Sequence, residues 1–112
     1  MSTVKFYGNP THFCAGKSCA FHLATNVDNK YLISTIGHYL VNGVLTKINV
    51  DTHYETMVFE IDGEDKYGNP NVIDWQGIDV VKMDDSMSAE RIHYEMIGKY
   101  SDTFYNIVNF TI

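Results

Sequence analysis

Two cysteines and two histidines near the start of the chain are the side chains most evidently suited to binding a metal. They are His12, Cys14, Cys19 and His22. Thiolates and imidazoles hold zinc in tetrahedral sites, so this set is a candidate for a zinc site. Zinc motifs usually arrange their ligands as two tight pairs separated by a longer spacer, whereas here the histidines flank the cysteines. The simpler interpretation is ordinary surface histidines and buried free cysteines with no cofactor, and zinc remains the alternative.

A second candidate combines a histidine with a carboxylate. His93 falls within the apolar stripe of a predicted helix, between Ala89 and Met96, and Glu55 shares one face of a predicted strand with Met57. If the helix covers that face, the two side chains meet beneath it. Such a pair can act as a general base and its orienting partner. The alternative is a buried polar pair that seats the helix on the sheet, because buried polar groups must be paired in any case.

The positions of these side chains are set by a series of short extended segments and one helix that the sequence predicts. Alternating and β-branched segments bounded by turn residues predict strands, and an apolar stripe of period 3.6 predicts the helix, which Ser86 or Ser88 can cap. Asp28-Asn29-Lys30 and Asn42-Gly43 are turn sequences, so we expect a hairpin at each. The expected extended segments are 20–27, 31–40, 44–50, 53–61, 72–75, 78–83 and 104–112, with loops at 8–19 and 62–71 and the helix at 88–100.

The element pattern predicts an α+β fold. We expect a small two-layer domain in which one helix from the C-terminal half packs across a mostly antiparallel sheet. A chain of 112 residues buries about two thirds of its unfolded surface, which suits a single domain over 1–112. The apolar runs are far shorter than the roughly 20 residues that cross a bilayer, and the first residues lack the apolar core of a signal peptide. We therefore expect a cytoplasmic protein without membrane contacts.

The net charge of the chain limits the classes of partner that it is expected to bind. Fourteen acidic residues against eight basic ones give a net charge of −6, and Arg91 is the sole arginine. The lysines are scattered along the sequence, whereas nucleic-acid binding needs clustered positive charge to neutralise phosphates. Non-specific binding to nucleic acid is therefore not expected. The eight tyrosines favour a recognition surface, because tyrosine is enriched where proteins contact each other.

Three stretches read together resemble a known family. They are YLISTIGHY at 31–39, HYETMVF at 53–59, and Asp74-Trp75 followed by a helix carrying A-E-x2-H-x2-M from Ala89. This resembles a family of small bacteriophage-encoded proteins that has no assigned activity, and the match covers about residues 31–100. The resemblance implies an accessory protein acting in the cytoplasm of the infected cell. Its pattern positions Glu55, Trp75 and His93, with Tyr54, are the candidate binding residues.

These observations lead to one expected function and two alternatives. We expect a non-catalytic binding module that inhibits a host protein, such as an antagonist of host defence. The first alternative is a protein that sequesters or cleaves a small nucleotide in a pocket formed by His93 and Glu55. The second is a minor virion or assembly component, for which a homo-oligomer would be expected.

Overall fold

The computed structural model of the chain describes residues 2–7, 18–42, 44–46, 53–101 and 105–111, and for 18–20, 39–41, 45–46 and 105–111 it describes the backbone alone. In this part of the chain there are eight strands and one helix. In chain order they are β1 (Ser2–Tyr7), β2 (Ser18–Val27), β3 (Tyr31–Val41), β4 (Val44–Thr46), β5 (Tyr54–Glu64), β6 (Pro70–Val72), β7 (Asp79–Met83), α1 (Ser86–Tyr100) and β8 (Tyr105–Thr111).

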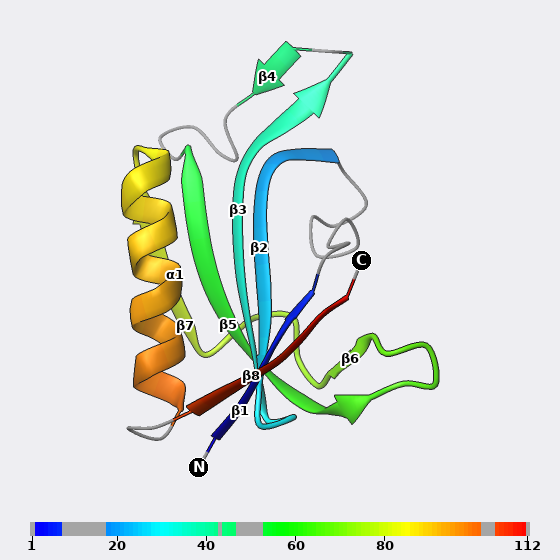
Figure 1. Cartoon of the computed structure of the whole chain (residues 1–112). Coiled ribbons are helices and arrows are strands. Elements are labelled where there is room, and N and C mark those ends of the chain that lie inside the picture. The colour runs from blue at the N-terminus through cyan, green and yellow to red at the C-terminus, as the bar shows by residue number, and fades with distance from the viewer. Residues whose placement is uncertain (1, 8–17, 43, 47–52, 102–104, 112) are drawn as a thin grey trace.

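The strands form one mixed sheet with the order β6-β5-β3-β2-β1-β8, to which β4 adds beside β3 and β7 beside β5. The β1–β8 pair is parallel, and the other pairs among the described strands are antiparallel. Helix α1 lies along one side of the sheet, as Figure 1 shows. The expected α+β fold, a mostly antiparallel sheet with one helix late in the chain packed across it, is therefore confirmed.

Two turns set the register of the central strands. Asp28 and Asn29 have φ angles of 57° and 55°, the left-handed conformation that a two-residue hairpin turn needs and that Asn and Asp tolerate. This turn pairs Val27 with Tyr31 and thereby joins β2 to β3. Asn42 has a φ of 52°, and Val41 pairs with Val44 across that turn. Both predicted hairpins are confirmed.

The sheet has apolar side chains on both faces, because successive residues of a strand point to opposite sides. On the face under α1, which we call the helix face, Ile33 and Val58 are cross-strand partners and pack with Ile97. On the opposite face, which we call the far face, Leu32 and Phe59 are cross-strand partners in a second cluster. The side chains of β3 and β5 therefore alternate between the helix face, where they pack under α1, and the far face.

Helix α1 buries the stripe that its sequence predicts. Its buried residues are Ala89, His93, Met96 and Ile97. The helix begins at Ser86 rather than Ser88, and its N-cap is Asp85, whose carboxylate accepts a hydrogen bond from the Ser88 amide at 2.8 Å. The predicted serine cap is therefore wrong. Asp is as good a cap as Ser, since either side chain can accept from the free amides of the first turn.

Other boundaries also differ from the prediction. Strand β1 was not predicted, and β2 begins at Ser18, so Cys19 lies in a strand rather than a loop. The expected loop 62–71 is shortened because β5 runs on to Glu64 and β6 begins at Pro70. The predicted segment 44–50 is confirmed as far as Thr46, and 47–50 lies outside the described residues. No helix in the described ranges has the length and apolar character needed to cross a membrane.

Candidate functional site

His93 lies at the centre of a buried polar network between α1 and the sheet. Its Nε2 is 2.8 Å from Thr25 Oγ1 on β2, and its Nδ1 is 2.8 Å from Thr35 Oγ1 on β3. Thr35 Oγ1 is in turn 2.6 Å from Thr56 Oγ1 on β5. All four side chains are buried, and His93 has no exposed surface. The helix is thus tied to three neighbouring strands through one imidazole ring.

The network suits a neutral imidazole. A neutral ring has one N–H donor and one acceptor nitrogen, and a hydroxyl can serve either, so both nitrogens are satisfied without a charge. Burial lowers the pKa of His93 from 6.5 to about 4, because the charged ring would lose its hydration. Solvent and substrate have no access to the ring. The geometry therefore favours a role in seating the helix over a role in catalysis.

Glu55 does not join this network. On β5 the residue that faces α1 is Thr56, which is the cross-strand partner of Thr35, so Glu55 points to the far face with Met57 and Phe59. The predicted His93–Glu55 pair is therefore not formed. The prediction placed the helix on the face of β5 that carries Met57 and Phe59, whereas it covers the face that carries Thr56 and Val58.

Tyr54 belongs to an aromatic cluster beyond the histidine network on the helix face. Its ring lies over Gly37, its cross-strand partner. The ring also meets Phe21 edge-on at a centroid distance of 5.5 Å and His38 at 5.2 Å. The His38 and His53 rings lie 5.3 Å apart. A β-carbon at Gly37 would overlap the Tyr54 ring, so glycine at this position permits the packing.

The candidate zinc ligands are described in part. His12 and Cys14 lie outside the described residues, and Cys19 is described by its backbone in β2. His22 is half-buried on the far face, where it is the cross-strand partner of Ile36. Within the described ranges, no three His, Cys, Asp or Glu side chains are grouped so that they could hold a metal ion. The zinc hypothesis stays a prediction.

A second polar cluster, which the sequence does not indicate, lies where β1 meets the end of β5. The Glu64 carboxylate accepts hydrogen bonds from Lys5 Nζ at 2.9 Å and from the Tyr7 hydroxyl at 2.6 Å. Asn26 Nδ2 donates to the Tyr7 oxygen at 3.0 Å. Burial, followed by the hydrogen bond to Glu64, raises the pKa of Tyr7, so this phenol stays protonated and links the strands.

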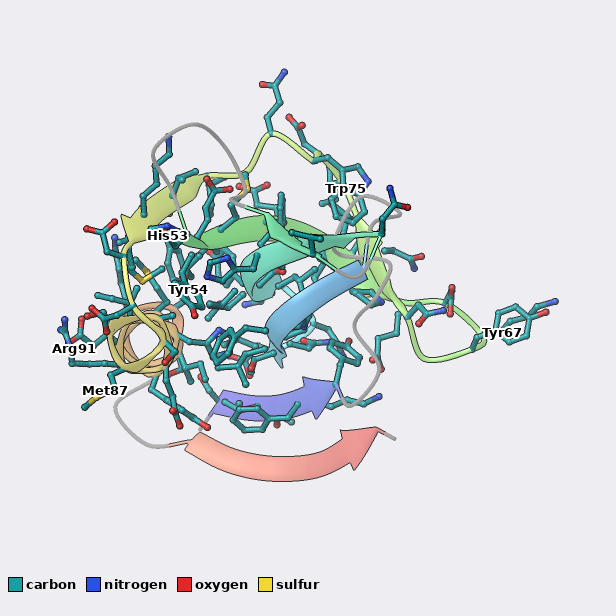
Figure 2. All side chains as sticks on the ribbon, turned by 90° about the horizontal axis from the view of Figure 1, so that it is seen from above. His53, Tyr54, Tyr67, Trp75, Met87 and Arg91 are labelled. Carbon is teal, nitrogen blue, oxygen red and sulfur yellow. The ribbon has the colours of Figure 1, made fainter. Side chains whose placement is uncertain are left out.

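Trp75 lies in an exposed apolar patch beside β5, well away from the end-on helix in Figure 2. Its ring meets Phe59 at a centroid distance of 5.2 Å, and Val80 is the cross-strand partner of Met57. The backbone of this segment follows β5, since the Ile73 and Ile78 amides donate to Glu60 and Val58 oxygens. Four apolar side chains of the segment are exposed, and we call them the edge patch: Ile73 (63%), Trp75 (55%), Ile78 (48%) and Val80 (45%).

Acidic residues flank the edge patch at both ends. Asp74 is exposed within the segment, and Asp84 and Asp85 are exposed just after β7. Lys82, also exposed, is the cross-strand partner of Glu55, so its charge faces an opposite one. Of the predicted binding residues, Trp75 belongs to this patch. Glu55 lies next to it, because its cross-strand partner Lys82 is two residues from Val80 on β7. Tyr54 and His93 instead belong to the helix face.

The chain was compared with family models, curated proteins and solved structures. No family model matches it, and neither does any curated protein or solved structure.

Proposed function

We propose that this protein is a non-catalytic binding module that docks on a host protein through the edge patch and inhibits it. The single observation that carries the proposal is the exposure of four large apolar side chains on one short segment, from Ile73 to Val80. Single exposed apolar residues are ordinary on a protein surface, whereas a group of them on one segment is typical of an interaction site.

The composition of the patch supports the proposal. Trp75 is held edge-on against Phe59, which fixes its orientation before a partner arrives. A tryptophan fixed in this way loses little side-chain entropy on binding, and tryptophan is among the residues that most often dominate interface energies. The backbone beneath the patch is fixed as well, because Ile73 and Ile78 are hydrogen-bonded to β5.

The buried histidine also supports a binding role over an enzymatic one. His93 is enclosed by threonines, and Glu55 lies on the other face of the sheet. A nucleotide pocket built from these two side chains would need them on one face. No observation therefore favours the nucleotide alternative. The virion-component alternative stays a prediction, and no contact in the described residues favours it.

The resemblance implies only a context, an accessory protein acting in the cytoplasm of the infected cell, and this context favours a host protein as the partner and inhibition as the role. Small bacteriophage-encoded proteins act in the cytoplasm of the infected cell, and a compact acidic domain with an exposed apolar patch fits the task of blocking a host protein surface. The net charge of −6 keeps the free protein soluble and disfavours contact with nucleic acid. A basic host protein surface is thus favoured as its target.

The test compares two double variants with the wild-type protein in a bacterial host. The patch variant combines Trp75→Ala with Ile78→Ser. The matched control combines Tyr67→Ala with Met87→Ser, which removes one exposed aromatic and one exposed aliphatic side chain that are not part of the patch and lie away from Trp75 in Figure 2. Each protein is purified with its bound host proteins after cross-linking, and those proteins are identified by mass spectrometry.

We expect a host protein that is retained by wild type and by the matched control but lost from the patch variant. The activity of that protein should fall when purified wild-type protein is added. Circular dichroism and thermal melts establish that both variants are folded. Equal retention by the patch variant and wild type would refute the assignment of the patch, and full activity of the bound host protein would refute inhibition.

A further inference from the structure

One residue of the edge patch, Val80, lies on strand β7 (Asp79–Met83), which follows the other three. Strand β7 pairs with β5 along one side, and no other strand of the described chain pairs with its second side. The amides and carbonyls on such an edge form a template on which another strand can add. Strand addition is a common way in which a protein recognises an extended peptide segment.

The side chains of β7 alternate between two environments. Asp79 and Val81 point to the helix face, where Asp79 accepts hydrogen bonds from Lys99 at 2.7 Å and from the Tyr100 hydroxyl at 2.9 Å. Val80 and Lys82 point to the far face and are exposed. A strand added to β7 would therefore place every second side chain beside Val80 and Lys82 on the far face. An apolar residue beside Val80 would bury the part of the edge patch that β7 carries.

The acidic residues near the edge patch determine which side chains are favoured at the two ends of the added strand. The edge patch is apolar at its centre, and Asp74 lies at one end while Asp84 and Asp85 lie at the other. Opposite charges across an interface steer association and fix register.

We propose that β7 and the edge patch bind an extended segment of the partner that is apolar at its centre and carries Lys or Arg at both ends. The segment adds to β7 as a strand. This inference rests on the proposed function and names the chemistry of the partner. A second copy of this chain is disfavoured as the occupant, because two antiparallel β7 strands would bring the acidic end of one copy against the acidic end of the other.

The first experiment selects binders from a random library of 12-residue peptides displayed on their own mRNA, with the intact wild-type protein as the target. Binding of the selected peptides is then measured by fluorescence anisotropy. The charge variant combines Asp74→Asn with Asp84→Asn. The matched control combines Asp28→Asn with Glu90→Gln, which removes the same number of charges away from the patch. Asn retains the side-chain oxygen with which Asp74 and Asp28 accept backbone hydrogen bonds.

We expect selected peptides with alternating apolar residues at the centre and Lys or Arg at both ends. Their affinity should fall about fivefold to tenfold in the charge variant at low salt, as two rim charges predict, and should stay at the wild-type value in the control. Hydrogen exchange should slow at the β7 amides when peptide is bound, because added-strand hydrogen bonds protect them.

Three outcomes would overturn the proposal. One is a selection that yields no binder, or that yields acidic or uncharged ones. A second is equal affinity in the charge variant and wild type. The third is protection of β7 without peptide together with a dimer in sedimentation, which would assign the edge to a second copy. Peptide affinity that depends on Trp75 but not on charge would leave the proposed function intact, whereas host-protein retention unaffected by the patch variant would remove that function itself.

Discussion

Acidification should destabilise the protein through His93 before its carboxylates are protonated. The folded state holds this ring neutral, with a pKa lowered by burial from 6.5 to about 4. Between these two values the unfolded chain binds a proton and the folded chain does not. The free energy of unfolding must therefore rise with pH across this window. The contribution is complete above about pH 6.5 and is lost by about pH 4.

The size of the effect follows from the two pKa values. Each pKa unit corresponds to 1.36 kcal/mol, so the change from 6.5 to about 4 amounts to about 3 kcal/mol. This is a large share of the roughly 5–15 kcal/mol that stabilises a typical domain. The carboxylates act at lower pH, since hydrogen bonds hold the pKa values of Asp65, Asp79 and Asp85 below the usual 3.8. Their stabilisation is lost as the pH falls through those lowered values.

The assay is urea unfolding followed by far-UV circular dichroism at pH 7.0, 6.0, 5.0 and 4.5. Wild type is compared with His93→Gln, in which the amide can donate and accept hydrogen bonds but cannot take up a proton in this range. The free energy of unfolding of wild type should fall more steeply than that of the variant, by up to about 1.4 kcal/mol per pH unit. His53→Gln removes a histidine elsewhere while retaining His93.

Equal pH dependence of wild type and His93→Gln between pH 4.5 and 6.5 would refute this reasoning. A direct titration of the imidazole by NMR provides the second check. If the ring signals of His93 move with a midpoint near pH 6.5 in the folded protein, the ring is not held neutral by burial. The hydroxyl network would then have to accommodate an imidazolium.

Two further predictions concern residues on the helix face of the sheet. Thr35→Val should lower the free energy of unfolding in urea by about 1–3 kcal/mol, because it leaves a buried nitrogen of His93 without its partner; an unchanged value would contradict the hydrogen-bonding scheme. Gly37→Ala should cost about 1–3 kcal/mol in the same assay, since its methyl group meets the Tyr54 ring. Gly98→Ala, at an open helix position, is the control and should gain up to about 1 kcal/mol.

The parts of the fold that local sequence determines could be predicted. Asp28 and Asn29 favour a left-handed turn on their own account, so the β2–β3 hairpin follows from adjacent residues. The apolar stripe of α1 is likewise a local pattern, and it places His93 in the core. The helix cap was assigned to a serine because Ser and Asp compete equally for that role and both occur near the helix start.

The choice of face could not be predicted, and it decided the candidate site. Strand β5 has apolar side chains on both faces, with Val58 on one and Phe59 on the other, and both are buried. Alternation therefore does not say which face the helix covers. One choice pairs His93 with Glu55 and the other pairs it with threonines. The exposure of the edge patch could not be predicted from the sequence either, because the same residue type, such as valine, can be buried or exposed in a strand.

The parallel pairing of β1 with β8 also escapes a local analysis. Val4 is the partner of Ile107, and no turn or spacing connects the two ends of the chain. A six-residue strand gives a weak pattern by itself, and its assignment depends on a partner about a hundred residues away.

That same pair determines when the sheet can be completed during synthesis. The β2–β3 hairpin can close as soon as its residues are made, whereas β1, although made first, has to wait for Tyr105–Thr111. At about 5–20 residues per second, this interval lasts roughly 5–20 s. During that time the nascent chain carries β1 paired only with β2. The sheet is therefore completed only after Tyr105–Thr111 has been made and has paired with β1, so the fold gains its full stability in a late step.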